Sequence, residues 1–202
     1  MKNLIRILAA AAVAAPALPL ADAATWNIDP SHTRAGFSVK HLVITDVKGE
    51  FQKTSGKAQI DEQDLSKSSV EAAIATASID TREAKRDGHL KSADFLDVEK
   101  FPEITFKSTK VEASADGKLK IAGNLTIRGT TKPVTLDGEL TKTITDPWGN
   151  TRRGFSATTK VNRRDFGVSW GGITDAGPVV GDEVRIDIQA ELIKDKGAAA
   201  KS

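Results

Sequence analysis

The sequence predicts an all-β fold, an eight-stranded antiparallel barrel with a short helical insertion. Apolar and polar residues alternate along many segments, which is typical of antiparallel strands with one wet face and one dry face. These segments are long and are separated by turn residues at regular intervals, which favours a barrel over a sandwich. One charged stretch, 81–96, lacks the alternation, contains helix formers and begins with a possible N-cap at Thr81, so it is predicted to be helical.

The eight predicted strands differ in how clearly they alternate. The clearest are 118–128, 134–141, 155–161 and 184–192, and the less regular ones are 35–43, 51–60, 70–79 and 104–111. The Ala-rich segment 70–79 is also compatible with a short helix by propensity. Asp116-Gly117 favours a tight hairpin turn, and the residues 146–150 form a second cluster of turn formers.

The first 23 residues have the composition of a secretory signal peptide. Lys2 and Arg6 precede an apolar run, and residues 21–23 match a small-residue cleavage site. We therefore expect a signal peptide at 1–23, a β-barrel domain at 24–193 and a disordered tail at 194–202, with the mature protein in a bacterial periplasm.

Composition excludes several classes of function. The 29 basic and 27 acidic side chains nearly balance, which argues against a dedicated nucleic-acid binder. Cysteine is absent, so thiol catalysis, disulfides and thiolate metal sites are excluded. After the predicted signal peptide no segment approaches the roughly 18 apolar residues of a membrane-spanning helix, so no membrane span is expected.

Motifs for catalysis are weak in this sequence. Residues 167–171 match the G-x-S-x-G pattern of a nucleophile elbow, but a second glycine follows, which is a poor helix start, and no histidine lies downstream. His32, His41 and His89 show no metal-binding spacing. No catalytic or metal-binding residue is therefore predicted. The alternative that stays open is an enzyme that acts on a lipid-like or anionic substrate with a histidine and an aspartate as acid and base.

Small residues interrupt the apolar faces of the predicted strands. Gly123 and Gly138 either leave the lumen open for a lipid or kink the strands so that the barrel can close, and composition alone favours the kinks. The glycine-rich segment 167–182 is long for a connection. It is either a lid that brings Trp170 over a cavity or a solvated loop with one packed indole.

Nine segments resemble the YceI-like family of periplasmic, polyisoprenoid-binding proteins, in the family's order and across nearly the whole mature chain. The most specific of them is 86–97. They are 29–32 (DPSH), 37–42 (FSVKHL), 49–51 (GEF), 78–81 (SIDT), 86–97 (RDGHLKSADFLD), 101–108 (FPEITFKS), 123–129 (GNLTIRG), 131–134 (TKPV) and 162–167 (NRRDFG).

The resemblance implies a lipocalin-like barrel whose apolar lumen holds an isoprenoid chain, such as a quinone or a polyprenyl phosphate. It implies that the 24–193 domain binds, stores or transports this long-chain lipid without catalytic machinery. The expected bound group is therefore the isoprenoid lipid or quinone itself, with no catalytic cofactor. Some members of the family are dimeric, so a homodimer is among the expected assemblies.

The expected ligand-binding residues form an apolar lining and a polar end. The lining consists of the inward-facing residues Phe37, Phe51, Phe106, Leu125, Ile127, Leu136, Phe155 and Ile186. The candidates for contacts with the head group are His41, Asp87 and Arg163.

Overall fold

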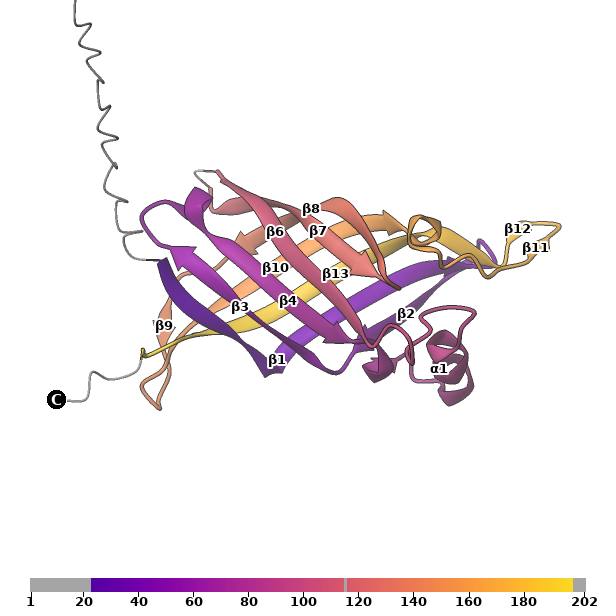
Figure 1. Cartoon of the computed structure of the whole chain (residues 1–202), viewed down its shortest axis with the longest axis horizontal. Helices are drawn as coiled ribbons and strands as arrows, with labels where there is room; N and C mark the ends of the chain where they lie inside the picture. Colours follow the sequence, from indigo (N-terminus) through magenta and orange to yellow (C-terminus); the bar gives the residue numbers. More distant parts are fainter. Residues whose placement is uncertain (1–22, 115, 198–202) are drawn as a thin grey trace, which may run out of the picture.

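The computed structural model describes residues 23–114 and 116–197, and over these residues the chain forms a closed antiparallel barrel of eight strands with one short α-helix (Figure 1). The all-β prediction is confirmed. The predicted signal peptide lies outside the described residues except for Ala23, and so does the predicted tail beyond Gly197. Within the described residues no helix is long and apolar enough to cross a membrane.

The barrel is an up-and-down meander in which each strand pairs with the next. Its strands are β1 (Ala23–His41), β3 (Thr54–Asp61), β4 (Ser69–Ala75), β6 (Glu103–Ala113), β7 (Lys118–Ile127), β8 (Thr130–Leu140), β10 (Thr151–Asn162) and β13 (Val180–Lys194). The ladder between β13 and β1 closes the circle. Because every barrel strand has two neighbours, the barrel has no free edge.

Shorter elements lie between these strands. They are β2 (Thr45–Phe51), η1 (Leu65–Lys67), η2 (Thr76–Ser78), β5 (Ile79–Asp80), α1 (Ala84–Lys91), β9 (Ile144–Thr145), η3 (Arg163–Phe166), β11 (Ile173–Thr174) and β12 (Gly177–Pro178). In Figure 1, α1, β2, β11 and β12 lie at one end of the barrel and β9 lies at the other.

Three details differ from the sequence-based predictions. β1 begins at Ala23 rather than at residue 35, and the predicted strand 51–60 is the last residue of β2 followed by β3. The Ala-rich segment 70–79 is mainly the strand β4, because β3 and β6 satisfy its backbone on both sides. The N-cap of α1 is Glu83 rather than Thr81, since the Glu83 carboxylate accepts hydrogen bonds from the N–H groups of Lys85 and Arg86.

The early part of β1 escaped prediction because its pairing changes halfway along the strand. Residues 23–27 pair with β3, whereas residues 35–41 pair with β2. Between these parts the register against β13 shifts, from Asp29 to Arg34. The extra residues interrupt the alternation of apolar and polar side chains, which was the signal used to find strands.

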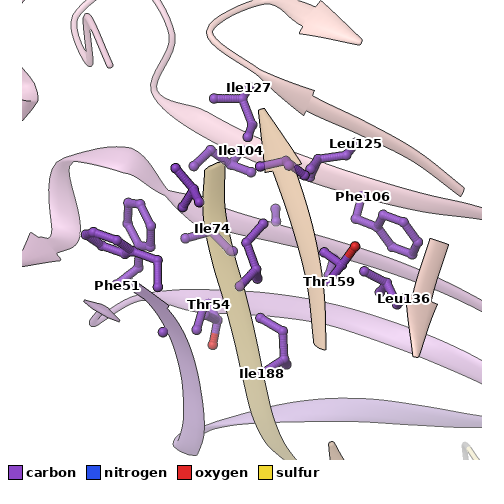
Figure 2. A pocket seen from close by; sticks show the side chains of 18 of the residues that line it. Phe51, Thr54, Ile74, Ile104, Phe106, Leu125, Ile127, Leu136, Thr159 and Ile188 are labelled. Carbon is purple, nitrogen blue, oxygen red and sulfur yellow. The ribbon is translucent and has the colours of Figure 1, made fainter. Parts of the chain in front are cut away.

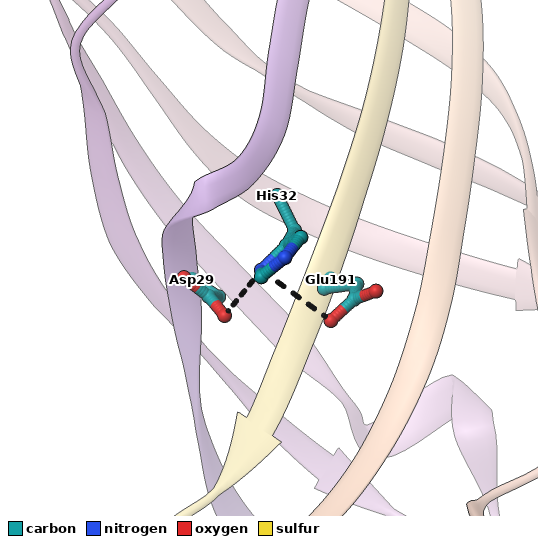
Figure 3. Close-up of side chains that lie close together, drawn as sticks. All are labelled: Asp29, His32 and Glu191. Atoms are coloured by element: carbon teal, nitrogen blue, oxygen red, sulfur yellow. Dashed lines mark hydrogen bonds and ion pairs between the residues drawn. The ribbon is translucent and has the colours of Figure 1, made fainter.

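An ionic network on the outer face fixes this register shift. Arg152 Nη1 donates to Asp29 Oδ2 at 2.7 Å and to Glu191 Oε2 at 2.8 Å, and Arg152 Nε donates to Asp146 Oδ2 at 2.7 Å. His32 Nδ1 lies 3.0 Å from Asp29 Oδ2 (Figure 3). The network therefore joins β1, β10, β13 and the turn that follows β9.

The network changes the acidity of its carboxyl groups. Hydrogen bonds from His32 and Arg152 lower the pKa of Asp29 to about 2, although burial acts in the opposite direction. Burial would also raise the pKa of Asp146, but hydrogen bonds from Arg152 and Asn150 hold it well below its ordinary value. Both carboxylates are therefore ionised at neutral pH.

Trp26 fills the end of the barrel where β9 lies. Its side chain is fully buried and packs in one cluster with Ala58, Ile60 and Leu192. The Lys194 ammonium lies 5.7 Å from the centre of the indole ring, within reach of a cation–π interaction. We call this end, around Trp26, the closed end.

The lowered pKa of Asp29 predicts a contribution to stability that depends on pH. A carboxyl whose folded pKa is about 2, against an ordinary value of 3.8, stabilises the fold fully above about pH 4, and this contribution is lost as the pH falls toward 2. We expect Asp29→Asn to lower the free energy of unfolding by about 1 kcal/mol at neutral pH, after a discount for solvent screening.

Urea denaturation of the wild type and of Asp29→Asn, at about pH 7 and at about pH 2, measures this contribution. The difference between the two proteins should shrink at the acidic pH. A difference that stays the same would contradict the lowered pKa of Asp29.

Candidate functional site

A cavity of about 640 Å³ lies inside the barrel and is lined by residues of all eight barrel strands. It extends from Leu192 near the closed end to Trp170 at the opposite end. This volume is typical of small-molecule sites, which measure roughly 300–1,000 Å³. The alternation of the strands explains its chemistry, because every second side chain points inward and these side chains are mostly Ile, Leu, Val and Phe (Figure 2).

Ten of the eleven predicted ligand-binding residues line this cavity; their role in binding stays a prediction. They are Phe37, His41, Phe51, Phe106, Leu125, Ile127, Leu136, Phe155, Arg163 and Ile186. The apolar ones could be found from the sequence because strand parity alone decides which residues face the lumen.

Asp87 does not line the cavity, so its predicted place at the polar end is corrected. Its Oδ1 atom accepts a hydrogen bond from the backbone N–H of Thr81 at 2.9 Å and another from the Thr81 hydroxyl. Asp87 therefore ties α1 to the end of β5. The α1 residues that do line the cavity are Lys85, Arg86, His89 and Leu90.

The sequence-based prediction of the site missed Lys85 and Leu90 of α1, and for Arg86 and His89 it leaves open whether residues 86–89 bind a polar head group or hold the helix against the barrel. The spacing of 85, 86, 89 and 90 places them on one face of a helix. It also missed Thr54, whose buried hydroxyl oxygen lines the cavity and has no hydrogen-bond partner among the described residues. That hydroxyl is free to bond a polar group of a guest.

Three phenylalanine rings lie over glycines of neighbouring strands. A Cβ atom on Gly123 would come within 2.6 Å of Phe106 Cε2, and one on Gly138 within 3.2 Å of Phe155 Cε2. The three pairs are Phe37 with Gly49, Phe106 with Gly123 and Phe155 with Gly138. Neither interpretation given from the sequence describes these glycines fully. They provide room for a ring beside the wall, so the ring does not cross the lumen.

Arg163 is predicted to contact a ligand head group, but its guanidinium has no free donor. It is buried, and all five of its N–H groups are engaged. The acceptors are the main-chain carbonyls of Val168, Trp170, Val180 and Gly181 and the carboxylate of Asp182. Burial lowers the pKa of Arg163, and the charge of Asp182 opposes this. Arg163 therefore holds the segment 167–182 against β13, and its contact with a ligand head group stays a prediction.

The end of the cavity opposite Trp26 is formed by α1, the C-terminal end of β1 and the segment 167–182, and we call it the mouth. Here the Trp170 ring lies 4.8 Å from the His89 ring and 5.1 Å from the Phe95 ring, measured between centroids. His89 Nε2 is 2.9 Å from Asp94 Oδ2. The indole lines the cavity and is 39% exposed, so it lies between the lumen and solvent.

The serine of the G-x-S-x-G match does not lie in a nucleophile elbow. Ser169 follows a short 3-10 helix rather than a strand, and no helix follows it up to Gly197, where the described residues end. It is also absent from the cavity lining.

Asp29, His32 and Glu191 form a compact group that resembles a metal site, with one possible ligand atom from each within 4.8 Å of the others (Figure 3). The arrangement does not suit a cation. Arg152 Nη1 already donates to the Asp29 and Glu191 oxygens that face His32, and its positive charge would repel a metal ion. The three residues are on the outer face and do not line the cavity.

Comparison with known proteins finds relatives along nearly the whole barrel. A family model described as the YceI-like domain matches residues 26–192. Protein YceI of Salmonella newport is 42% identical over 176 residues, which are 86% of this chain and 89% of the relative. A UPF0312 protein of Vibrio parahaemolyticus is 39% identical over 181 residues, which are 88% and 91% of the two chains.

Solved structures share the same architecture. A Campylobacter jejuni YCEI protein is 32% identical with a TM-score of 0.67, covering 78% of this chain and 90% of that one. A domain of Saccharophagus degradans described as polyisoprenoid-binding has a TM-score of 0.62 and covers 86% of this chain and all of that one. At 12% identity it shows a common fold alone.

The contact between Phe106 and Gly123 predicts a way to fill the lumen. We expect Gly123→Val to push the Phe106 ring inward, to weaken binding of the apolar dye N-phenylnaphthylamine, and to cost about 1–3 kcal/mol of stability. Dye fluorescence titration measures the first effect and urea denaturation the second. Ala122→Val is the matched control, because it adds bulk to the outer face of the same strand. Unchanged dye affinity in a folded Gly123→Val protein would contradict the prediction.

The hydrogen bonds of Arg163 predict that it anchors the segment 167–182. We expect Arg163→Met to cost about 2–4 kcal/mol and to speed amide hydrogen exchange in this segment. Arg164→Met is the control, because Arg164 is about half exposed and its ion pair with Asp182 should contribute less than about 1 kcal/mol. Equal costs, or unchanged exchange in 167–182, would show that Arg163 is not the anchor.

Proposed function

This chain belongs to the YceI-like family, and from that premise we propose that it binds, stores or transports an isoprenoid or a similar long-chain lipid in the barrel lumen. The observation that carries the proposal is the apolar cavity of about 640 Å³ along the barrel. Each methylene group that leaves water for such a cavity contributes about 0.8 kcal/mol. The name of the Saccharophagus degradans domain, a polyisoprenoid-binding domain, supports the same class of ligand.

The proposal assigns the protein no catalytic step. Among the described residues, His89 and Asp94 are the histidine–aspartate pair at the cavity, and no hydroxyl group hydrogen-bonds to the His89 imidazole. A general base removes a proton that lies within hydrogen-bond reach, and no hydroxyl group of the described residues brings such a proton to His89. The enzyme alternative would therefore have to act on a proton of the guest itself.

We also propose that the mature protein works in the periplasm, as the composition of residues 1–23 indicates. A long isoprenoid chain is insoluble in that aqueous space, so a protein that encloses the chain lowers the cost of moving it between membranes.

Native mass spectrometry of the purified protein, followed by solvent extraction, tests the proposal. We expect a stoichiometric long-chain lipid, and the same spectra report whether the protein is a homodimer. Leu136→Trp should reduce the bound lipid about tenfold because it fills the lumen, whereas Thr135→Trp adds the same side chain to the outer face and should leave the lipid in place.

An empty protein that also fails to take up added menaquinone and geranylgeraniol would overturn the proposal. Turnover of an added isoprenoid phosphate that disappears in His89→Gln would favour the enzyme alternative instead.

A further inference from the structure

The charged residues of the cavity wall all have one sign. Six described lining residues carry basic side chains, and none carries a carboxylate. The six are Lys40, His41, Lys85, Arg86, His89 and Arg163. The chain as a whole has 29 Lys and Arg residues, 3 His residues and 27 acidic residues, so this selection does not follow from its composition.

These basic side chains gather at the mouth, while the rest of the wall is apolar apart from a few serine and threonine residues. Lys85, Arg86 and His89 come from α1, and His41 is the last residue of β1. His41 pairs with Val180 at the start of β13, where the segment 167–182 ends. A guest with its apolar chain in the lumen would therefore place its head group among them.

Three of the six are already engaged. Lys40 pairs with Asp46, His89 with Asp94, and Arg163 has no free donor. The carboxylates of Asp46, Asp94 and Asp182 are thus each paired with a basic group, and that of Asp87 accepts hydrogen bonds from Thr81. They add little repulsion toward an incoming anion.

The other three basic groups are available. Arg86 donates through Nε and Nη2 to Thr81, which orients its guanidinium and leaves Nη1 without a partner among the described residues. Lys85 and His41 form no side-chain hydrogen bond or ion pair with any described residue. A fixed guanidinium beside a flexible ammonium is a combination that binds phosphate and carboxylate oxygens.

We propose that the mouth selects amphiphiles with an anionic head group over neutral ones, through Lys85, Arg86 and His41. This inference rests on the proposed binding of an isoprenoid chain in the lumen. A phosphate monoester at the mouth accepts charge-assisted hydrogen bonds that an alcohol or a quinone carbonyl makes only in a weaker form. A carboxylate accepts the same kind of hydrogen bond, but it has fewer oxygens and less negative charge than a phosphate monoester.

Four probes with the same isoprenoid chain test the inference: geranylgeranyl phosphate, geranylgeranoic acid, geranylgeraniol and a menaquinone with a geranylgeranyl chain. Their affinities are measured by displacement of N-phenylnaphthylamine from the full mature protein. At low ionic strength we expect the phosphate to bind about tenfold more tightly than the alcohol. This preference should shrink as salt screens the exposed Lys85.

The ratio of the phosphate affinity to the alcohol affinity is the quantity to compare between variants. We expect this ratio to fall about threefold in Lys85→Gln and about tenfold in the double variant Lys85→Gln, Arg86→Gln. Lys142→Gln removes the same charge at the opposite end, between β8 and β9, and should leave the ratio unchanged.

The outcomes separate this inference from the proposed function. Equal binding of the phosphate, the acid, the alcohol and the quinone overturns the inference and leaves isoprenoid binding standing. Binding of none of the four overturns both. Tighter binding of the acid as well as the phosphate supports an anionic site of either kind, and tighter binding of the phosphate alone restricts the site to phosphates. A ratio that falls equally in Lys142→Gln would show that net charge, not the mouth, causes the preference.

Discussion

The ladder between β13 and β1 is the contact on which the rest of the molecule depends, because it turns an open sheet into a closed lumen. β1 spans 19 residues, Ala23 to His41, and must pair with β13 along its length while it changes partner from β3 to β2 on its other side. A regular strand cannot keep register with all three. The shift between Asp29 and Arg34 resolves the conflict, and the network around Arg152 holds it in place on the outer face, away from the cavity. The network that stabilises the register shift therefore lies on the outer face of the barrel wall, and the cavity lies on its inner face.

The openness of the lumen has a separate cause. Eight strands give an interior that side chains are able to fill, and the inward residues here include several phenylalanines. The glycines opposite three of these rings give each ring a place beside the wall, as for Phe106 over Gly123. A glycine on one strand thus makes room for a phenylalanine ring of the neighbouring strand, and the axis of the barrel stays clear.

The fold and the lining of the cavity could be predicted from the sequence because both follow from a local period of two. The predicted strand 118–128 matches β7, and the inward residues Leu125 and Ile127 follow from their parity. Arg163 and Asp87 could not be assigned in this way. Their partners include main-chain carbonyls and a threonine placed by the tertiary fold, so a charge that looks free in the sequence is hydrogen-bonded within the protein in the structure. The basic residues of α1 are an intermediate case. Their helical spacing is visible in the sequence, but the orientation of that face toward the lumen is not.

The fully buried Trp26 packs against Leu192 at the closed end of the cavity, and the mouth lies at the opposite end. A chain can therefore leave only by sliding back along its own length, and every methylene must return to water before the tail is free. The barrier to exit should rise with the number of isoprene units, so residence time would grow steeply with chain length even among guests that share a head group. In this way a lumen closed at one end would retain long chains and lose short ones, without any residue that recognises chain length.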